Sequence, residues 1–291
     1  MVFSRYFAVV FYHLDFEHLA KHFERNPSMT KIAVAISNDN IDVTPFETID
    51  AIEKAGFQDV FIQWYNKDWN PSQQQQLEYV KQKGLNIIFT HLGYQGINSL
   101  WEEGSAGDEL VVRYKNDLDI CKTNNFDLVI MHLSAKQVAP AYGEVGLSRI
   151  REITEYAKKL GIKVAFENTR HKGYLEYVIN NIPDDNVGIC FDSGHCHAHF
   201  DNDFNFELFK DRIFAIHLHD NDKSGDLHLT PYDGTMDWDW VLRNLKYANY
   251  DGPITLELCY RNEYLTQNLV DFYRNGYEVA IDLAHRFDEI G

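Results

Sequence analysis

The chain has 291 residues, of which 45% are hydrophobic and 14% aromatic, so it can bury a large core and is not an intrinsically disordered protein. Lys and Arg number 27 against 44 Asp and Glu, and the resulting charge of −17 makes nucleic acid an unfavoured partner unless a local basic patch overrides it. No apolar stretch approaches the ~18 residues that a membrane-spanning helix needs. The four cysteines lack paired Cys-x-x-Cys spacing, and we expect reduced thiols in a cytoplasmic protein.

Residues 1–28 precede the pattern that fills the rest of the sequence. Their apolar segment at 5–14 is too short to cross a membrane, and no small-residue cleavage site follows it. We expect this segment to form an extra strand or helix that caps the body. The predicted division is therefore an N-terminal extension at 1–28 and one domain at 29–291.

From residue 31 onward, short apolar runs alternate with amphipathic segments. Eight runs are predicted to be strands, at 31–37, 59–64, 85–92, 127–134, 163–168, 187–192, 213–220 and 253–259. The predicted helices lie at 45–55, 71–83, 108–124, 147–160, 174–181, 206–210, 237–247 and 264–287. Several of them end in a glycine just before the next strand, as in "KAGFQDV" and "KKLGIKV".

This alternation predicts an α/β fold with a single (β/α)8 TIM barrel. The strands are apolar on both faces, as parallel strands buried between helices must be. Eight strand-then-helix units with right-handed crossovers leave few other topologies. The alternative, an open doubly wound sheet, is less favoured because no G-x-G-x-x-G follows the first strand.

Ligand-type side chains end six consecutive strands. They are His91, His132, Glu167, Asp192, His217 with His219, and Glu257. In a barrel of this kind the carboxyl ends of the strands meet at one mouth, where chemistry takes place. A single histidine at a strand end is usually structural, but a carboxylate in an apolar strand is costly unless it is compensated, so Glu167 and Glu257 are the sharpest signals. The whole set predicts a divalent metal site.

The stretch "GICFDSGHCHAHF" at 188–200 crowds several of these groups. Asp192 closes the sixth strand and His195 follows three residues later, so both can reach one centre or two neighbouring ones. We expect His197 and His199 to be loop or helix-start residues, because no strand directs them. His217 and His219 share one strand face, and the spacing alone does not decide which of them binds metal.

Further ligands and substrate contacts are predicted on the loops. Asp226 and His228 lie together after the seventh strand and are additional candidate ligands. Candidate substrate contacts are His195, His219, Arg170, Arg261, Trp64, Trp101 and Tyr94. The arginines suit a phosphate or carboxylate on the substrate, and the aromatic rings suit the wall of a sugar pocket, although surface pairing and packing are the ordinary roles of these residues.

The strand-end order and the motifs "FENT", "CFDSGH", "HLHDND", "GDLHL" and "LEL" resemble the xylose isomerase-like superfamily of TIM barrels, over about residues 30–285. That superfamily contains sugar isomerases, ketose 3-epimerases, inosose dehydratases and endonuclease IV, and the motifs are most similar to its sugar phosphate isomerase/epimerase branch. The resemblance implies a main metal (Zn, Mn, Mg or Co) held by Glu167, Asp192, His217 and Glu257, with His195 near the substrate. In the ketose epimerases, the matching metal ligand is alternatively His219.

The resemblance to endonuclease IV implies a different use of the same mouth. In endonuclease IV, a cluster of three zinc ions is bound by several residues. The positions that match them here are all of those just named, together with His91, His132, Asp226 and His228. We favour the sugar isomerase or epimerase, with Glu167 and Glu257 as metal-bound acid/bases, because the net charge and the acidic loop at 93–109 suit a DNA backbone poorly. A dehydratase is not distinguished from an isomerase, since both begin with proton abstraction next to a carbonyl. The aromatic-rich last helix suggests a homo-oligomer.

Overall fold

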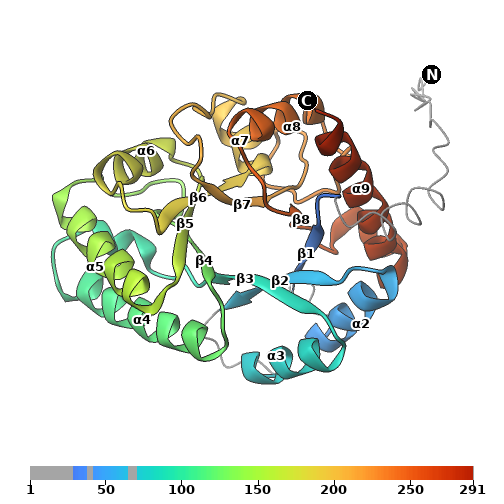
Figure 1. Ribbon diagram of the computed structural model, residues 1–291, viewed down its shortest axis with the longest axis horizontal. Coiled ribbons are helices and arrows are strands. Elements are labelled where there is room, and N and C mark those ends of the chain that lie inside the picture. Colours follow the sequence, from blue (N-terminus) through green and yellow to red (C-terminus); the bar gives the residue numbers. More distant parts are fainter. Residues whose placement is uncertain (1–28, 38–41, 65–70, 291) are drawn as a thin grey trace, which may run out of the picture.

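Eight parallel strands follow one another around a barrel, with helices on the outside (Figure 1). The computed structural model describes residues 29–37, 42–64 and 71–290, so the predicted extension at 1–28 lies outside the described residues. The strands are β1 (Ile32–Ile36), β2 (Asp59–Trp64), β3 (Asn86–Leu92), β4 (Leu128–Met131), β5 (Lys163–Glu167), β6 (Val187–Asp192), β7 (Ile213–His217) and β8 (Ile254–Leu256). Their order is β7-β6-β5-β4-β3-β2-β1-β8.

A short bridge closes the barrel between its two end strands. The backbone N–H of Leu218, just after β7, donates to the carbonyl of Thr255 at 2.9 Å, and that of Glu257 donates to the carbonyl of Leu218 at 3.0 Å. The eight parallel strands alternating with helices confirm the predicted TIM barrel.

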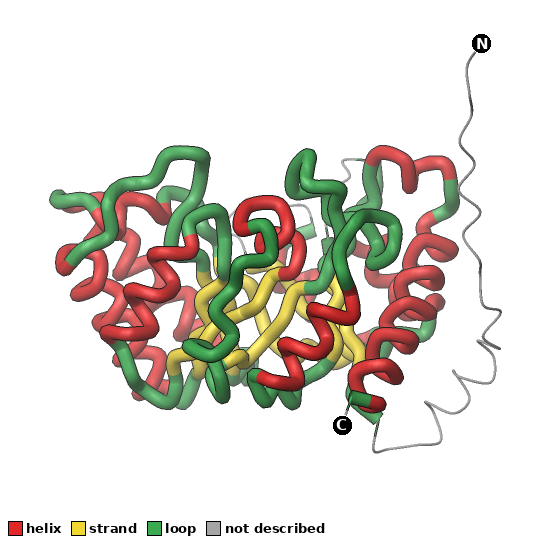
Figure 2. Tube along the Cα trace, turned by 90° about the horizontal axis from the view of Figure 1, so that it is seen from above, coloured by secondary structure: helices red, strands yellow, loops and turns green. Residues whose placement is uncertain are grey.

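The helices form the outer layer around the strands (Figure 2). They are α2 (Pro45–Ala55), α3 (Gln73–Gln82), α4 (Ser105–Thr123), α5 (Glu144–Leu160), α6 (Lys172–Asn181), α7 (Ser193–Phe200), α8 (Trp238–Tyr247) and α9 (Leu269–Glu289), with 3-10 turns η1 (Ile97–Trp101) and η2 (Asn262–Thr266). None of the described helices is both long enough and apolar enough to cross a membrane.

Side-chain caps decide where several helices begin. Thr44 and Ser72 each form a capping box with the side chain three residues later. Asp237 and Asn268 cap α8 and α9 by accepting a hydrogen bond from the backbone N–H three residues on. The predicted helix at 264–287 is therefore divided, because the cap at Asn268 starts a new helix after η2.

The connection between β6 and β7 differs from the prediction. The predicted helix at 206–210 is wrong: this segment forms consecutive turns, and Phe206 and Phe209 anchor it in the core. The helix of this unit is α7, which begins immediately after β6 because the carboxylate of Asp192 accepts a hydrogen bond from the N–H of His195. His195, His197 and His199 are thus helical residues.

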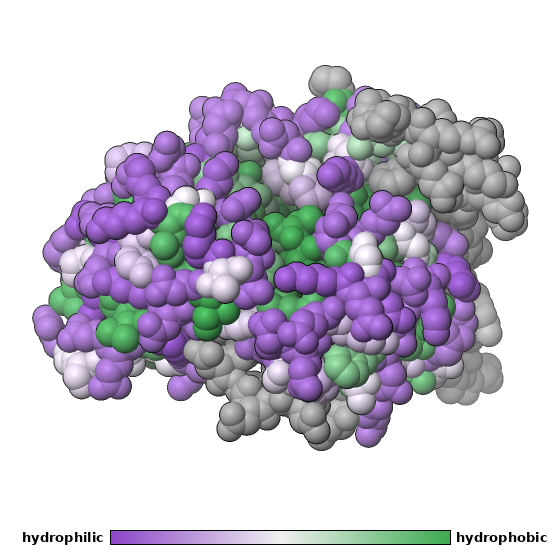
Figure 3. All heavy atoms as spheres, turned by 60° about the horizontal axis from the view of Figure 1, so that its bottom comes forward, coloured by the Kyte–Doolittle hydropathy of each residue, from purple (hydrophilic) through white to green (hydrophobic). Residues whose placement is uncertain are grey.

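The barrel interior is packed at its centre by one side chain from each of seven strands. These are Ala35, Phe61, Phe89, Ile130, Ala165, Cys190 and Ala215. The two phenylalanine rings stack at 4.8 Å between centroids and occupy the space that the alanines opposite leave free. A second, larger cluster fills the layer between the strands and the helices. The face of the molecule drawn in Figure 3 is mostly hydrophilic, with its hydrophobic atoms concentrated toward the middle.

Candidate metal centre

The strand register places eight polar side chains above this packed layer. Side chains two positions apart on a strand point to the same face. The residue two positions after each residue of the central layer therefore also points into the barrel, closer to the carboxyl end of its strand. These residues, in strand order from β1 to β8, are Ser37, Gln63, His91, His132, Glu167, Asp192, His217 and Glu257. For His217 and Glu257, the inward-facing residues two positions earlier are Ala215 and Thr255, both of which are buried. Six of these eight residues are predicted from the sequence as site residues, whereas Ser37 and Gln63 are not.

Four of these side chains form the tightest group. One ligand atom from each of Glu167, Asp192, His217 and Glu257 lies within 4.8 Å of the other three, and all four residues are buried. Three carboxylates gathered in an apolar barrel repel one another and lose their hydration, so the arrangement requires a positive charge among them. Carboxylate oxygens with one imidazole nitrogen form a donor set that suits a divalent transition-metal ion.

His217 lacks the hydrogen bonds that a buried imidazole normally makes. Its side chain is completely buried, and neither ring nitrogen has a hydrogen-bond partner among the described residues. Nδ1 lies 3.5 Å from Oε1 of Glu167 and 3.4 Å from Oε2 of Glu257, which is close enough for an ionic interaction but does not form a hydrogen bond. The ring is fixed by stacking on Phe61 at 4.7 Å. A donor atom held without a partner between two carboxylates fits a metal ligand.

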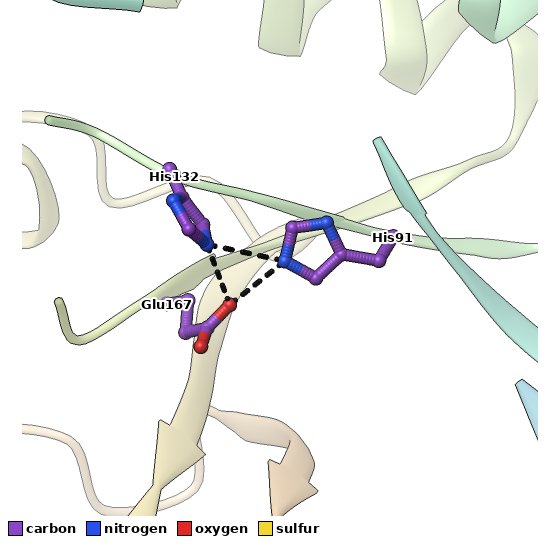
Figure 4. Close-up of side chains that lie close together, drawn as sticks. All are labelled: His91, His132 and Glu167. Atoms are coloured by element: carbon purple, nitrogen blue, oxygen red, sulfur yellow. Dashed lines mark hydrogen bonds and ion pairs between the residues drawn. The ribbon is translucent and has the colours of Figure 1, made fainter. Parts of the chain in front are cut away.

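Glu167 connects this group to a second one. Its Oε2 lies 2.9 Å from Nε2 of His91 and 3.1 Å from Nε2 of His132, and Figure 4 shows the two rings converging on this one oxygen. Its Oε1 faces His217 and, at 3.3 Å, Nδ1 of His195. His91, His132 and Glu167 also satisfy the geometry of a metal group. The carboxylate of Glu167 is thus shared between two potential ion positions.

The surrounding imidazoles control the ionisation of Glu167. Burial raises the pKa of this carboxyl, but interactions with the imidazoles of His132, His217 and His195 outweigh burial and hold its pKa well below the usual value. Burial dominates at His132, whose pKa is lowered despite the contact with Glu167. Burial also opposes protonation of His217, yet Cys190, Glu257 and Glu167 together raise its pKa well above the usual value. The carboxylate is therefore ionised at neutral pH.

Asp192 has both a structural and a potential ligand role. It caps α7, its backbone N–H donates to Oδ1 of Asn168 at 2.8 Å, and the Asn168 side chain donates back to the Asp192 carbonyl at 2.8 Å. Both carboxylate oxygens of Asp192 lie 3.2 Å from Nε2 of His219. His219 therefore orients Asp192, whereas His217 faces the other carboxylates. The His219 ring fits beneath α7 only because residue 194 is glycine, since a Cβ there would lie 1.9 Å from the ring.

A third group lies on the loop after β7. Oδ1 of Asp226 is 3.3 Å from Nε2 of His228, and Oδ2 is 3.2 Å from Nε2 of His195. His219, Asp226 and His228 satisfy the geometry of a metal group, and the rings of His219 and His228 stack at 4.0 Å. Burial opposes protonation of His195 and His228, but nearby carboxylates, and for His228 also Cys259, raise the pKa of each ring well above its usual value.

Asp220, which sequence analysis did not single out, organises this loop. Its completely buried carboxylate accepts hydrogen bonds from the N–H groups of Asn221, Tyr232 and Met236 and from the indole of Trp238. These bonds join both ends of the loop that carries Asp226 and His228. The two acids in "HLHDND" indicated that a carboxylate has a role here. Sequence periodicity, however, does not distinguish a carboxylate that accepts hydrogen bonds from the backbone from one that binds a metal.

Above the four-residue group lies a cavity of about 230 Å³. It is lined by Ser37, Gln63, His91, Tyr94, His132, Glu167, His195, Asp226, His228, Glu257, Cys259 and Arg261. Asp192 and His217 lie beneath its floor, fully buried. The volume is smaller than the ~300–1,000 Å³ typical of pockets for drug-sized ligands, so the cavity suits a small polar molecule.

The residues predicted to contact the substrate do not all lie at this cavity. Arg261 lines the cavity and donates to the Asp226 carbonyl at 3.0 Å, and Tyr94 stacks on His132 at 4.3 Å. Trp101 is instead a core residue whose indole donates to the Leu133 carbonyl at 2.6 Å, and Trp64 is also buried away from the cavity lining.

Arg170 lines a separate cavity together with two residues of α7, His197 and His199. His197 makes hydrogen bonds to Asn202 at 3.1 Å and to Thr235 at 2.9 Å, the role of a structural residue. Nε2 of His199 is buried without a hydrogen-bond partner among the described residues.

Comparison with known proteins supports the fold and shows the family. A family model described as xylose isomerase-like TIM barrel matches residues 49–279. An uncharacterized protein, y4fM, of Sinorhizobium fredii is 33% identical over 100 residues, which cover 34% of this chain and 32% of that protein. The match therefore spans about a third of y4fM. The inosose isomerase of Bacillus subtilis is 24% identical over 202 residues, 62% of this chain and 70% of that enzyme.

Among solved structures, the IolI protein with a bound zinc atom superposes with a TM-score of 0.69 at 19% identity. The superposition covers 89% of this chain and all of that one (100%). At this level of identity the similarity establishes the shared barrel.

Proposed function

Because this chain belongs to the xylose isomerase-like TIM barrel family, we propose that it is a metal-dependent sugar isomerase or epimerase that moves a proton next to a carbonyl group. The observation that carries the proposal is the placement of Glu167 and Glu257, two buried carboxylates beside the same nitrogen of an imidazole that makes no hydrogen bond, at the floor of a small polar cavity. The inosose isomerase relative acts, by its name, on a small polyol ketone, which agrees with the cavity volume.

Glu167, Asp192, His217 and Glu257 are the residues that would hold the ion. The carboxylate oxygens of the three acids fit a divalent ion, and so do the ring nitrogens of His217, which have no hydrogen-bond partner among the described residues. When bound, a divalent ion polarises the oxygens of a hydroxy-ketone and stabilises the negative charge of the enediolate. We assign this role to His217 rather than His219, because His219 is already engaged with both oxygens of Asp192.

The two glutamates are the proposed acid/bases. They come from β5 and β8, so their carboxylates approach a substrate in the cavity from different sides. One carboxylate removes the proton from the carbon next to the carbonyl, and the electron pair of that C–H bond moves into the enediolate. The other carboxylate, protonated, returns a proton to the opposite face for epimerisation or to the neighbouring carbon for isomerisation.

The neighbouring side chains prepare these carboxylates for proton transfer. Gln63 Nε2 lies 3.5 Å from Oε1 of Glu257 and fixes the orientation of its carboxylate. His195 lines the cavity, and the acids around it raise its pKa against the effect of burial, so it carries a proton and can donate a hydrogen bond to a substrate oxygen. Tyr94 and Arg261 complete the wall of the cavity.

A second candidate function is favoured by one observation. The mouth holds three ligand groups, the four-residue group and the flanking groups around His91 with His132 and around Asp226 with His228. Three ions at these positions would suit a zinc-dependent phosphodiesterase of the endonuclease IV type, acting on abasic DNA. The charge of −17 and the acidic segment at 93–109, which holds η1 and the start of α4, weigh against DNA.

One pair of assays separates these functions. The metal-loaded protein is incubated in deuterium oxide with a panel of ketoses, ketose phosphates and inososes, and each sugar is analysed for carbon-bound deuterium. The same preparation is tested for incision of an oligonucleotide that contains an abasic site. We expect deuterium incorporation without incision, and incision without exchange would replace the first proposal by the second.

A further inference from the structure

A tight turn places Tyr94 at the mouth of the barrel. The N–H of Ile97 donates to the carbonyl of Tyr94 at 3.1 Å, and Gly96 between them adopts a φ of 75°, a conformation that favours glycine at the third position of a turn. The turn follows β3 directly, and Tyr94 is 36% exposed. The position of the Tyr94 ring therefore depends on how firmly this turn is held.

The guanidinium of Arg113, on α4, binds the backbone on both sides of Tyr94. Its Nη2 donates to the carbonyl of Gly93 at 2.9 Å, and its Nη1 donates to the carbonyl of Gln95 at 2.7 Å. Since the carbonyl of Tyr94 accepts from Ile97, three successive carbonyls all have a partner. The planar fork of an arginine can join two carbonyls at once, whereas the ammonium group of a lysine is a single point. Arg113 is thus suited to fix this turn.

Tyr114, the next residue of α4, holds the same turn from the core. Its side chain is buried, and its hydroxyl donates to the carbonyl of Gly93 at 2.9 Å. Burial raises the pKa of Tyr114 to about 12, so the hydroxyl keeps the proton that it donates. The guanidinium of Arg113 lies 4.6 Å from the centroid of the Tyr114 ring, and this cation–π contact restricts its movement. Two adjacent residues of one helix thus fix the turn that carries Tyr94.

The ring of Tyr94 forms part of the wall of the metal cavity. It lies nearly parallel to the ring of His132, with an angle of 11° between the planes and 4.3 Å between the centroids, and both residues line the cavity. An aromatic ring beside a polar cavity offers apolar contact area to the C–H groups of a sugar. A displacement of the turn would therefore move this contact surface, while the carboxylates of Glu167 and Glu257 on β5 and β8 would stay in place.

We propose that Arg113 is a positioning residue, which holds the Tyr94 ring in the wall of the metal cavity so that the ring contacts the substrate. The substrate contact rests on the proposed function, whereas the positioning of Tyr94 rests on the hydrogen bonds of Arg113 to the turn. Arg113 is not among the residues that line the cavity, so it acts only through the turn. Its loss should therefore weaken substrate binding more than it slows the chemical step.

A double-mutant cycle tests whether Arg113 acts through Tyr94. Deuterium exchange into the sugar that exchanges fastest is measured for the metal-loaded wild type, Arg113→Lys, Tyr94→Ala and the double variant. Lysine keeps the charge but cannot bind both carbonyls. We expect Arg113→Lys to raise KM about 2- to 10-fold, to leave kcat unchanged, and to have no further effect in the Tyr94→Ala background.

The matched control is Arg151→Lys, which alters an exposed ion pair with Glu144 on α5 and should keep the wild-type KM. An unchanged KM in Arg113→Lys, or effects of the two substitutions that simply add in the double variant, would overturn the inference.

A spectroscopic measurement tests the positioning without turnover. Tyr94 is replaced by fluorotyrosine, whose fluorine resonance reports the ring current of the stacked imidazole of His132. Arg113→Lys should shift or broaden this resonance, and Arg151→Lys should not. If no sugar exchanges deuterium but the resonance responds to Arg113→Lys, the proposed reaction fails and the positioning role stands. If a sugar exchanges deuterium and Arg113→Lys leaves the resonance unchanged, the inference fails and the proposed reaction stands.

Discussion

Nδ1 of His217 lies 3.4 Å from Oε2 of Glu257, in the barrel interior, and no hydrogen bond joins the two groups. The stacking of the ring on Phe61 holds it in this position, and Oε1 of Glu167 lies 3.5 Å from the same nitrogen. A structural histidine would have turned one nitrogen toward a carbonyl or hydroxyl group, as His197 does toward Thr235. The relationship between His217 and Glu257 is therefore that of two ligands arranged around a common centre.

Removing the charge of either glutamate should abolish turnover. Glu167→Gln and Glu257→Gln preserve shape but eliminate the base, and general acid–base catalysis contributes about 10²–10⁴-fold to the rate. The rate of deuterium exchange into the sugar measures the effect, with circular dichroism to confirm the fold. Glu155→Gln, an exposed position on α5, is the matched control and should keep the wild-type rate. Near-normal exchange in either active-site variant would remove that residue from the mechanism.

Removing the metal should destabilise the protein. An ion that binds only the folded chain stabilises it by about 2.7 kcal/mol at a free concentration of 100 times Kd. For a domain of this size, that free energy corresponds to a shift in Tm of several degrees. Thermal unfolding with and without a chelator measures the shift, and adding back zinc or manganese should restore Tm. A Tm that chelator and metal leave unchanged contradicts the proposal.

Gly194→Ala should disrupt the support of Asp192. The new methyl group would overlap the His219 ring, so the ring must move away from the Asp192 carboxylate. We expect metal affinity to fall by about 10- to 100-fold, the usual effect of losing an outer-shell partner of a ligand. Gly225→Ala, in the loop after β7, is the matched control because its Cβ would meet open space. Equal metal affinity in both variants would show that His219 does not orient Asp192.

Metal affinity should increase with pH. Although burial alone favours the neutral ring, Cys190, Glu257 and Glu167 raise the pKa of His217 well above 6.5, so in the metal-free protein the ring is protonated at neutral pH. A proton on the imidazole competes with the ion, and therefore binding releases protons and strengthens as the pH rises toward that pKa. Calorimetry in buffers of different ionisation enthalpy measures the proton release. Binding that is independent of both pH and buffer would contradict this assignment.

The strands and the mouth were predictable because a short apolar run, and the polar side chain that ends it, are local features of the sequence. Each ligand-type residue ends an apolar run, so the carboxyl-end placement of Glu167 and Glu257 follows once a barrel is assumed. The same register argument would have found Ser37 and Gln63, but neither is a charged or imidazole side chain, and neither attracted attention.

What local pattern could not predict depended on tertiary contacts. The helix expected at 206–210 is absent because its two phenylalanines pack into the core, while α7 forms where a capping aspartate follows a strand. The different roles of His217 and His219 also stayed open, since both point to one strand face. Their separation depends on Gly194, which admits the His219 ring beneath α7.

The measurement that tests the central claim most directly is the metal content of the purified protein. Elemental analysis of wild type should find at least one divalent ion per chain, and Asp192→Asn should lose it, since asparagine keeps the helix cap but not the ligand charge. Asp185→Asn, at an exposed carboxylate, should retain the ion. A wild-type chain that neither carries nor takes up a divalent ion, or an Asp192 variant that holds it equally well, would contradict the account.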